Sequence, residues 1–211
     1  MYCKGRKVVT RPKDSEWTTY KPIQKVGKLC YHYCSKRSHL PIRDVLNDHR
    51  HGFKVEPNYE TATYNWCAKC NSTSVHAAIR DGLSHILFIT RYTGSKDRYI
   101  GHYFIVGYYE IGWITKVDGR CAIRARKMCF VPIEHAYNVG PDEWKRINKA
   151  GKTDVLTNLR YATQRISGEL LDEILQHLDN HDANKDYCRE VERLEAERRR
   201  MRHFPCKGER A

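Results

Sequence analysis

Two close pairs of cysteines lie in the first third of this 211-residue chain. Two thiolates from each of two tight turns can complete the tetrahedral shell that zinc adopts in structural sites. The chain has nine cysteines, an odd number, and its start has no apolar export signal, so a disulfide framework is not expected. The pattern predicts a structural zinc ion held by Cys30, Cys34, Cys67 and Cys70.

An acid–histidine step, Asp48-His49, lies between the two pairs, and Asn71 directly follows the last cysteine. A carboxylate and an amide oxygen suit a hard divalent cation, and a histidine with a near-neutral pKa can take a proton from water. Phosphodiester hydrolysis needs these groups, because an activated water attacks phosphorus while a cation stabilises the departing oxygen. The segment combines a zinc pattern, in which His32 or His39 could replace one cysteine, with a possible second metal site.

From Cys30 to Asn71, the order of a cysteine pair, Asp-His-x-His-Gly and Cys-x2-Cys-Asn resembles the HNH nucleases, most closely their zinc-stapled recombination endonuclease VII type. The resemblance implies a ββα-metal fold that holds one catalytic Mg²⁺ or Mn²⁺. In that fold Asp48 and Asn71 would bind the catalytic metal, and His49 would be the general base. The resemblance covers residues 30–71 and says nothing about the rest of the chain.

The net charge of +13 lies in the first 150 residues, which carry 26 basic and 13 acidic side chains, whereas residues 151–211 carry 12 of each. Such an excess favours a polyanionic partner, and nucleic acid is the most economical choice, with a merely solvated basic surface as the alternative. The longest apolar run, Phe104 to Ile114, is much shorter than the roughly 20 residues of a membrane-spanning helix. We therefore expect a soluble, cytoplasmic protein with no membrane partner.

Residues 83–135 predict a β meander. Its segments are rich in β-branched and aromatic residues, and turn residues separate them. They are Leu83–Thr90, Tyr99–Thr115 and Arg120–Val131. In the last segment apolar residues alternate with Arg124 and Arg126, so one face should meet a core. The other face, together with Lys127, would offer cations to phosphates.

The meander also resembles the PUA-like superfamily, especially its EVE and YTH members, which read modified bases. The residues that carry this resemblance are Ile86-Leu-Phe-Ile-Thr90, Arg98-Tyr99 and Phe104-Ile-Val-Gly-Tyr-Tyr-Glu-Ile111. It implies a small β-barrel in which aromatic rings hold a base by stacking. The rings that we expect to contact the base are Trp113, Tyr92 and Tyr108.

Helical patterns follow Pro141. Apolar residues from Ile166 to Leu178 recur at helical spacing, with Ser167 as the expected cap. Lys185–Arg202 has only a thin apolar stripe, which is typical of an exposed or partner-binding helix and could support a homodimer. The chain is thus expected to be an α+β protein made of a basic arm (1–29), a zinc-bound HNH-like unit (30–82), a PUA-like β-barrel (83–150) and C-terminal helices (151–211).

A zinc-stapled nuclease unit followed by an aromatic barrel is the architecture of a modification-dependent restriction endonuclease. Our first hypothesis is a metal-dependent enzyme that recognises a modified base in double-stranded DNA and cuts phosphodiester bonds nearby. The alternative is a non-catalytic, zinc-containing reader of modified DNA or RNA whose first unit is degenerate. A third hypothesis is a transcription-type zinc module joined to an unrelated β domain.

Overall fold

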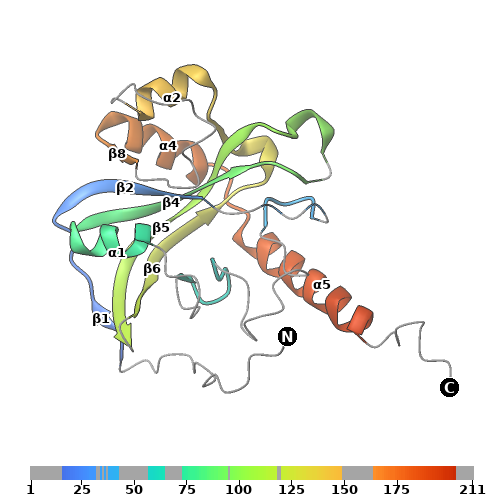
Figure 1. The fold of residues 1–211 in the computed structure, drawn as a ribbon, viewed down its shortest axis with the longest axis horizontal. Coiled ribbons are helices and arrows are strands. Elements are labelled where there is room, and N and C mark those ends of the chain that lie inside the picture. Colours follow the sequence, from blue (N-terminus) through green and yellow to red (C-terminus); the bar gives the residue numbers. More distant parts are fainter. Residues whose placement is uncertain are drawn as a thin grey trace.

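The computed structural model describes residues 16–31, 34, 36, 38–42, 57–64, 73–94, 96–117, 120–148 and 164–202. These residues form a large sheet and four α-helices, which confirms the α+β class expected from the sequence (Figure 1). None of the described helices is long and apolar enough to cross a membrane.

The described strands share one sheet in the order β3-β6-β5-β4-β2-β8, and β1 and β7 also pair with β5. Their bounds are Thr18–Thr19 (β1), Gln24–Tyr31 (β2), Thr63–Tyr64 (β3), Leu83–Arg91 (β4), Tyr103–Val117 (β5), Arg120–Phe130 (β6), Tyr137–Asn138 (β7) and Arg165–Ser167 (β8). No pairing between β3 and β8 is found within these residues, so closure into a barrel stays a prediction.

The 15-residue strand β5 is the centre of the sheet because each of its edges pairs with two strands. One edge pairs first with β4 and then, near its end, with β1, whereas the other pairs first with β7 and then with β6. The antiparallel order β4-β5-β6 confirms the meander that the sequence predicts. Strand β5 therefore lies between β1 and the cationic strand β6.

The described strands of all four predicted parts belong to this one sheet. Strand β2, which carries Cys30, pairs in parallel with β4, and β8 pairs with the other edge of β2. Helix α1 (Thr73–Arg80) precedes β4, and Gly82 after it adopts a φ of 68°, a left-handed conformation that ends a helix. The pairings join segments far apart in the chain, which alternation patterns cannot reveal.

Ile166 and Ser167 differ from the expectation, because they lie in the short strand β8 and not in a helix. Helix α4 (Glu169–Asp179) begins after Gly168, whose φ of 62° few other residues tolerate. Its side chains Leu171, Ile174 and Leu178 are buried, as the helical spacing predicts. Helix α2 (Pro141–Ile147) lies beside α4 at one end of the molecule (Figure 1).

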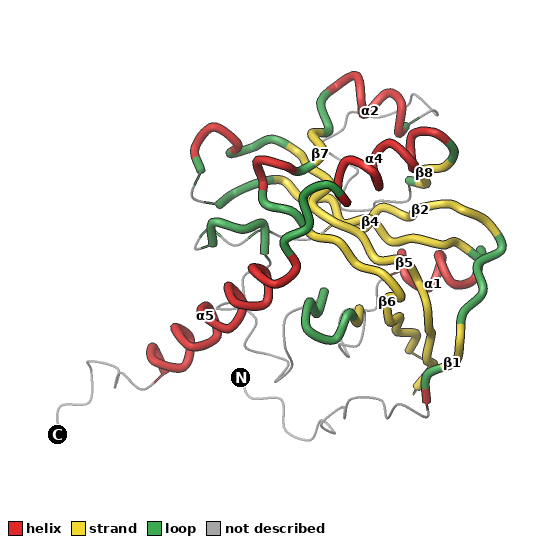
Figure 2. Tube along the Cα trace, turned by 180° about the vertical axis from the view of Figure 1, so that it is seen from behind, coloured by secondary structure: helices red, strands yellow, loops and turns green. Residues whose placement is uncertain are grey.

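The first residues of helix α5 (Asn184–Arg202) lie beside the last residues of β6, and the helix extends away from the sheet (Figure 2). The hydroxyl of Tyr187 donates to the Val131 carbonyl at 2.7 Å, and the thin apolar stripe of Tyr187, Val191 and Leu194 is buried within the chain's own core. The buried Glu190 accepts hydrogen bonds from Ser38 and Arg193. These contacts fix the first half of α5, while a homodimer through the C-terminal helices stays a prediction.

Candidate functional site

The residues expected to form the catalytic unit lie largely outside the described residues. Asp48, His49, Cys67, Cys70 and Asn71 fall in this category, so their proposed roles stay predictions. Cys30 and Cys34 are described. The structure therefore informs half of the expected zinc set and the whole of the expected base- and phosphate-binding set.

Cys30 and Cys34 are both buried, with exposed fractions of 2% and 9%, and neither forms a disulfide. Burial raises the pKa of the Cys34 thiol to about 11, although hydrogen bonds from Thr93 and Gly94 oppose the shift. Among the described residues no group of three or more metal-binding side chains is found. His39, the possible substitute ligand, has its Nδ1 atom 3.5 Å from Glu190 of α5.

The expected phosphate-binding cations share the outward face of β6. Ile123 and Ala125 are buried on the inward face, whereas Arg124 is half-buried and Arg126 and Lys127 are exposed. The β5–β6 ladder shifts register between Glu110 and Ile111 and again between Ile111 and Trp113. Such shifts re-aim side chains.

The two register shifts set which residues of β5 lie opposite the cations. Trp113 pairs with Arg124, and Glu110 pairs with Lys127. We call the outward face that carries Tyr108, Glu110, Trp113, Arg124, Arg126 and Lys127 the cation face.

At one end of the cation face, Arg124 lies over the rings of two tryptophans. Its guanidinium carbon is 4.8 Å from the centroid of the Trp113 ring and 5.2 Å from that of Trp17. Both indoles are half-buried, so each retains surface that a ligand could reach. Trp17, Trp113 and Arg124 form the tryptophan cluster, which contains one residue that sequence reasoning did not assign to the site.

At the other end of the cation face, the expected site residues Tyr108 and Lys127 both contact Asp179, which the sequence analysis did not assign to the site. The Tyr108 hydroxyl donates to Asp179 Oδ1 at 2.5 Å, and Lys127 Nζ donates to Asp179 Oδ2 at 2.6 Å. Burial, followed by the hydrogen bond and charge of Asp179, raises the pKa of Tyr108 well above its ordinary value. Asp179 is the last residue of α4, and no local motif marks it as a site residue.

His85 of β4 pairs with Glu110 and lies beside Tyr108 at this end of the face, with an exposed fraction of 7%. Its ring centroid is 5.8 Å from that of Tyr108, and its Nδ1 atom is 2.7 Å from Ser84 Oγ. Burial lowers the pKa of His85 to about 4, and the positive charges of Lys25 and Lys127 act in the same direction. His85 is therefore a neutral imidazole at physiological pH.

Between the two ends, Glu110 partly neutralises the cation face. Its carboxylate is 3.6 Å from Arg126, and the side chains are 31% and 51% exposed. Lys127 and Asp179 form a second half-exposed pair. Surface ion pairs of this kind contribute about 0–1 kcal/mol, so a phosphate group can compete with either carboxylate.

The three expected base-binding rings have different environments. Trp113 is half-buried on the cation face, whereas Tyr108 is buried beside His85 and Asp179. Tyr92 is fully buried, its ring packs edge-on against Tyr99 at 6.2 Å, and a Cβ atom on Gly94 would lie 2.4 Å from its hydroxyl. Trp113 is thus the one ring of the three that exposes surface to a ligand.

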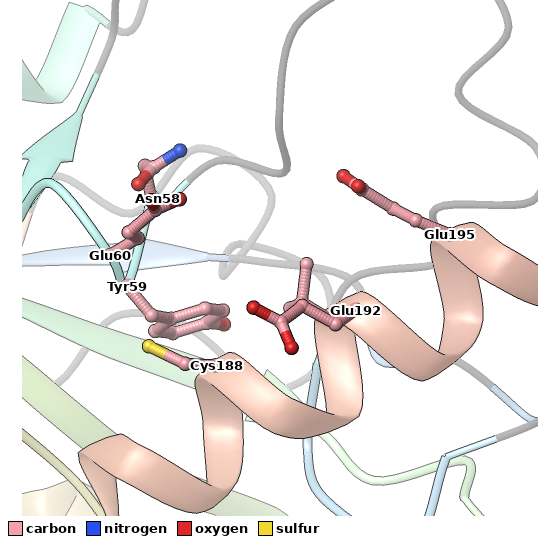
Figure 3. Close-up of a pocket in the computed structure, with 7 residues that line it drawn as sticks. Asn58, Tyr59, Glu60, Cys188, Glu192 and Glu195 are labelled. Carbon is pink, nitrogen blue, oxygen red and sulfur yellow. The ribbon is translucent and has the colours of Figure 1, made fainter.

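A small pocket lies elsewhere, between the loop at Asn58–Glu60 and helix α5 (Figure 3). Cys188 and Glu192 lie beside the Tyr59 ring there. Its volume of about 30 Å³ suits one or two water molecules and excludes a nucleobase. Its carboxylates, from Glu60, Glu192 and Glu195, would also repel a phosphate, so this pocket is not a nucleic-acid site.

Searches among protein-family models, curated proteins and solved structures found no match to this chain. The function must therefore be inferred from the residues themselves.

The buried His85 should make the protein sensitive to acid. The pKa of His85 is about 4 in the folded chain and 6.5 ordinarily. The fold therefore keeps its full stability above pH 6.5, where His85 is neutral in both the folded and unfolded chain, and loses stability as the pH falls towards 4. Between pH 7 and pH 4.5, we expect wild type to lose about 2 kcal/mol more unfolding free energy than His85→Gln, measured by urea denaturation. His135→Gln, which changes an exposed histidine, should follow wild type. Equal losses in wild type and His85→Gln would contradict a buried neutral imidazole.

Proposed function

We propose that this protein is a metal-dependent endonuclease that recognises DNA carrying a modified base and cuts phosphodiester bonds nearby. The observation that carries the nucleic-acid part is the cation face, where Arg124 lies over a partly exposed tryptophan and Arg126 and Lys127 follow along the same strand. Cations contact the phosphate backbone, and an indole contacts a base through its ring face. The net charge of +13 supports the same class of partner.

The catalytic part of the proposal rests on Asp48, His49 and Asn71. A carboxylate and an amide oxygen form a donor set that fits Mg²⁺ or Mn²⁺, which would stabilise the charge on the departing oxygen. His49 would take the proton of the attacking water, because an imidazole with an unshifted pKa is half-neutral near physiological pH. The resemblance to HNH nucleases assigns the same roles to these residues.

The zinc part of the proposal rests on four thiolates. Cys30 and Cys34 are buried thiols outside any disulfide, a donor set that fits zinc, and Cys67 and Cys70 would complete the tetrahedral shell. Zinc supplies a structural cross-link between two chain segments there. The PUA-like barrel is the matching proposal for the sheet, in which β5 and β6 carry the base-reading face.

A second candidate function is a non-catalytic reader of modified DNA or RNA. The cation face favours it, because the tryptophan and cations of β5 and β6 can bind nucleic acid without any contribution from His49. The two functions share a binding surface and differ only in whether bound nucleic acid is cut.

Cleavage of plasmid DNA separates the two candidates. With Mg²⁺ or Mn²⁺, we expect wild type to cut plasmid that carries modified bases and to spare unmodified plasmid. His49→Ala should lose at least about 100-fold in rate, because general-base catalysis contributes roughly 10²–10⁴-fold.

Gel analysis of plasmid nicking and linearisation measures this, and His135→Ala is the matched exposed-histidine control. Equal cutting by wild type and His49→Ala would exclude the proposed catalytic base. Binding of modified DNA without cutting by any protein would establish the reader instead.

Metal content tests the zinc proposal directly. We expect about one zinc ion per purified chain by plasma mass spectrometry, and its loss in Cys34→Ser and Cys70→Ser, because a tetrahedral site rarely survives removal of a thiolate. Cys188→Ser, which alters a half-buried cysteine of α5, should retain zinc. Full zinc content in Cys34→Ser would instead point to His32 or His39 as the ligand.

Asp179 should weaken nucleic-acid binding in the wild-type protein. Its carboxylate occupies Lys127, so Asp179→Asn frees a cation while keeping an acceptor for Tyr108. We expect about two- to tenfold tighter binding of a labelled oligonucleotide by fluorescence anisotropy, with a steeper salt dependence. Asp186→Asn, which makes the same charge change beside Arg189 on α5, should have no such effect. Weaker binding by Asp179→Asn would show that phosphates do not contact Lys127.

A further inference from the structure

The tryptophan cluster is built from three neighbouring strands. Thr19 of β1 pairs with Trp113 of β5, and Trp113 pairs on its other side with Arg124 of β6. Trp17 precedes β1 by one residue, so side-chain alternation places it on the same side as Thr19 and Trp113. One indole thus comes from each of two adjacent strands, and the cation comes from the third.

Both indoles stay partly exposed, in contrast to the third described tryptophan. Trp144 in α2 has an exposed fraction of 4% and belongs to the core, whereas Trp17 and Trp113 are half-buried. The cation–π contacts of Arg124 stabilise an exposed site only weakly, so they do not explain two large aromatic rings at the surface. Partly exposed tryptophans beside cations are typical of nucleic-acid-binding surfaces.

We propose that Trp17 and Trp113 form a stacking platform for an unpaired base. This inference rests on the proposed nucleic-acid binding and adds its substrate form. A paired base in a duplex already stacks on both neighbours, so its ring faces cannot reach a protein indole. An unpaired base offers those faces, and any base can stack because each has a π surface.

The surrounding charge selects among ligands that an aromatic platform could hold. Arg124 already contacts both indoles, and Arg126 and Lys127 continue along the same face. A second cation, such as a methylated lysine, would meet repulsion there, whereas a base joined to phosphates would meet attraction. The accessible part of the face runs from Glu110 to Trp113, roughly 10 Å at about 3.3 Å per residue, which leaves room for a phosphate next to the base.

The test compares three forms of one labelled sequence by fluorescence anisotropy: a single strand, a perfect duplex, and a duplex with one central mismatch. The single strand presents unpaired bases directly, and the mismatch presents a base that leaves the helix at low cost. We expect wild type to bind the single strand, the mismatched duplex or both at least fivefold more tightly than the perfect duplex. Which of the two binds identifies the source of the unpaired base.

Substitutions then assign the preference to the platform. Trp17→Ala and Trp17→Leu should each weaken binding of the preferred form by about five- to a hundredfold, since stacking of one base is lost. Trp17→Leu keeps apolar bulk beside β1, and Trp17→Phe, which retains a ring, should recover most of the affinity. Ile100→Ala, which trims a 49%-exposed apolar side chain elsewhere, is the matched control.

The outcomes separate this inference from the proposed function. Wild-type affinity in Trp17→Leu together with weak binding in Arg124→Gln would overturn the platform and leave nucleic-acid binding in place. Equal binding of perfect duplex and single strand would also overturn it. Failure of the wild-type protein to bind any of the three forms would overturn both proposals.

Discussion

The cation face depends on the two register shifts between β5 and β6. A slip of one residue turns every side chain of a strand to the opposite face, and the shifts bring Trp113 opposite Arg124 within the same ladder that pairs Glu110 with Lys127. Gly112 lies in the second shift, where a Cβ atom would approach Arg126 Cβ to 2.8 Å. Glycine is required because the two strands come too close there for a side chain.

The same face contains the acids that limit its attraction for polyanions. Glu110 pairs with Arg126, and Asp179 pairs with Lys127 while accepting the Tyr108 hydroxyl. Both pairs are half-exposed, so their separation costs little, and phosphate oxygens can replace the carboxylates. In the proposed nucleic-acid-binding role, these pairs would reduce non-specific binding through charge alone and would favour a ligand that also contacts the indoles.

Local patterns predicted the local elements. Alternation placed Arg124 outward from the buried Ile123 and Ala125, and turn residues separated β4, β5 and β6 as expected. The pairing of β2 with β4 is a long-range contact and has no local signal. The sequence of a strand also does not show which of its aromatic residues are buried in the core and which are exposed at the surface.

The convergence of Asp179 on the face was equally hidden, because Asp179 of α4 lies 52 residues after Lys127 in the chain, beyond the meander. Trp17 showed a possible signal, a tryptophan within a basic segment, but its position beside Trp113 depends on the pairing of β1 with β5. The cation face was thus partly predictable, and the residues that complete it were not.

The shared sheet also constrains how the proposed parts work together. Cys30 lies in β2, which pairs with β4, and β4 pairs with β5, where Trp113 lies. A zinc ion at Cys30 would be attached to the same sheet that carries the proposed base platform, without a linker between them. Backbone pairing fixes the separation of strands at about 4.8 Å each, so a nuclease unit stapled by that zinc ion would lie at a set distance from the proposed base platform. A nuclease unit on a flexible linker would instead cut over a range of distances, because linker length sets its reach.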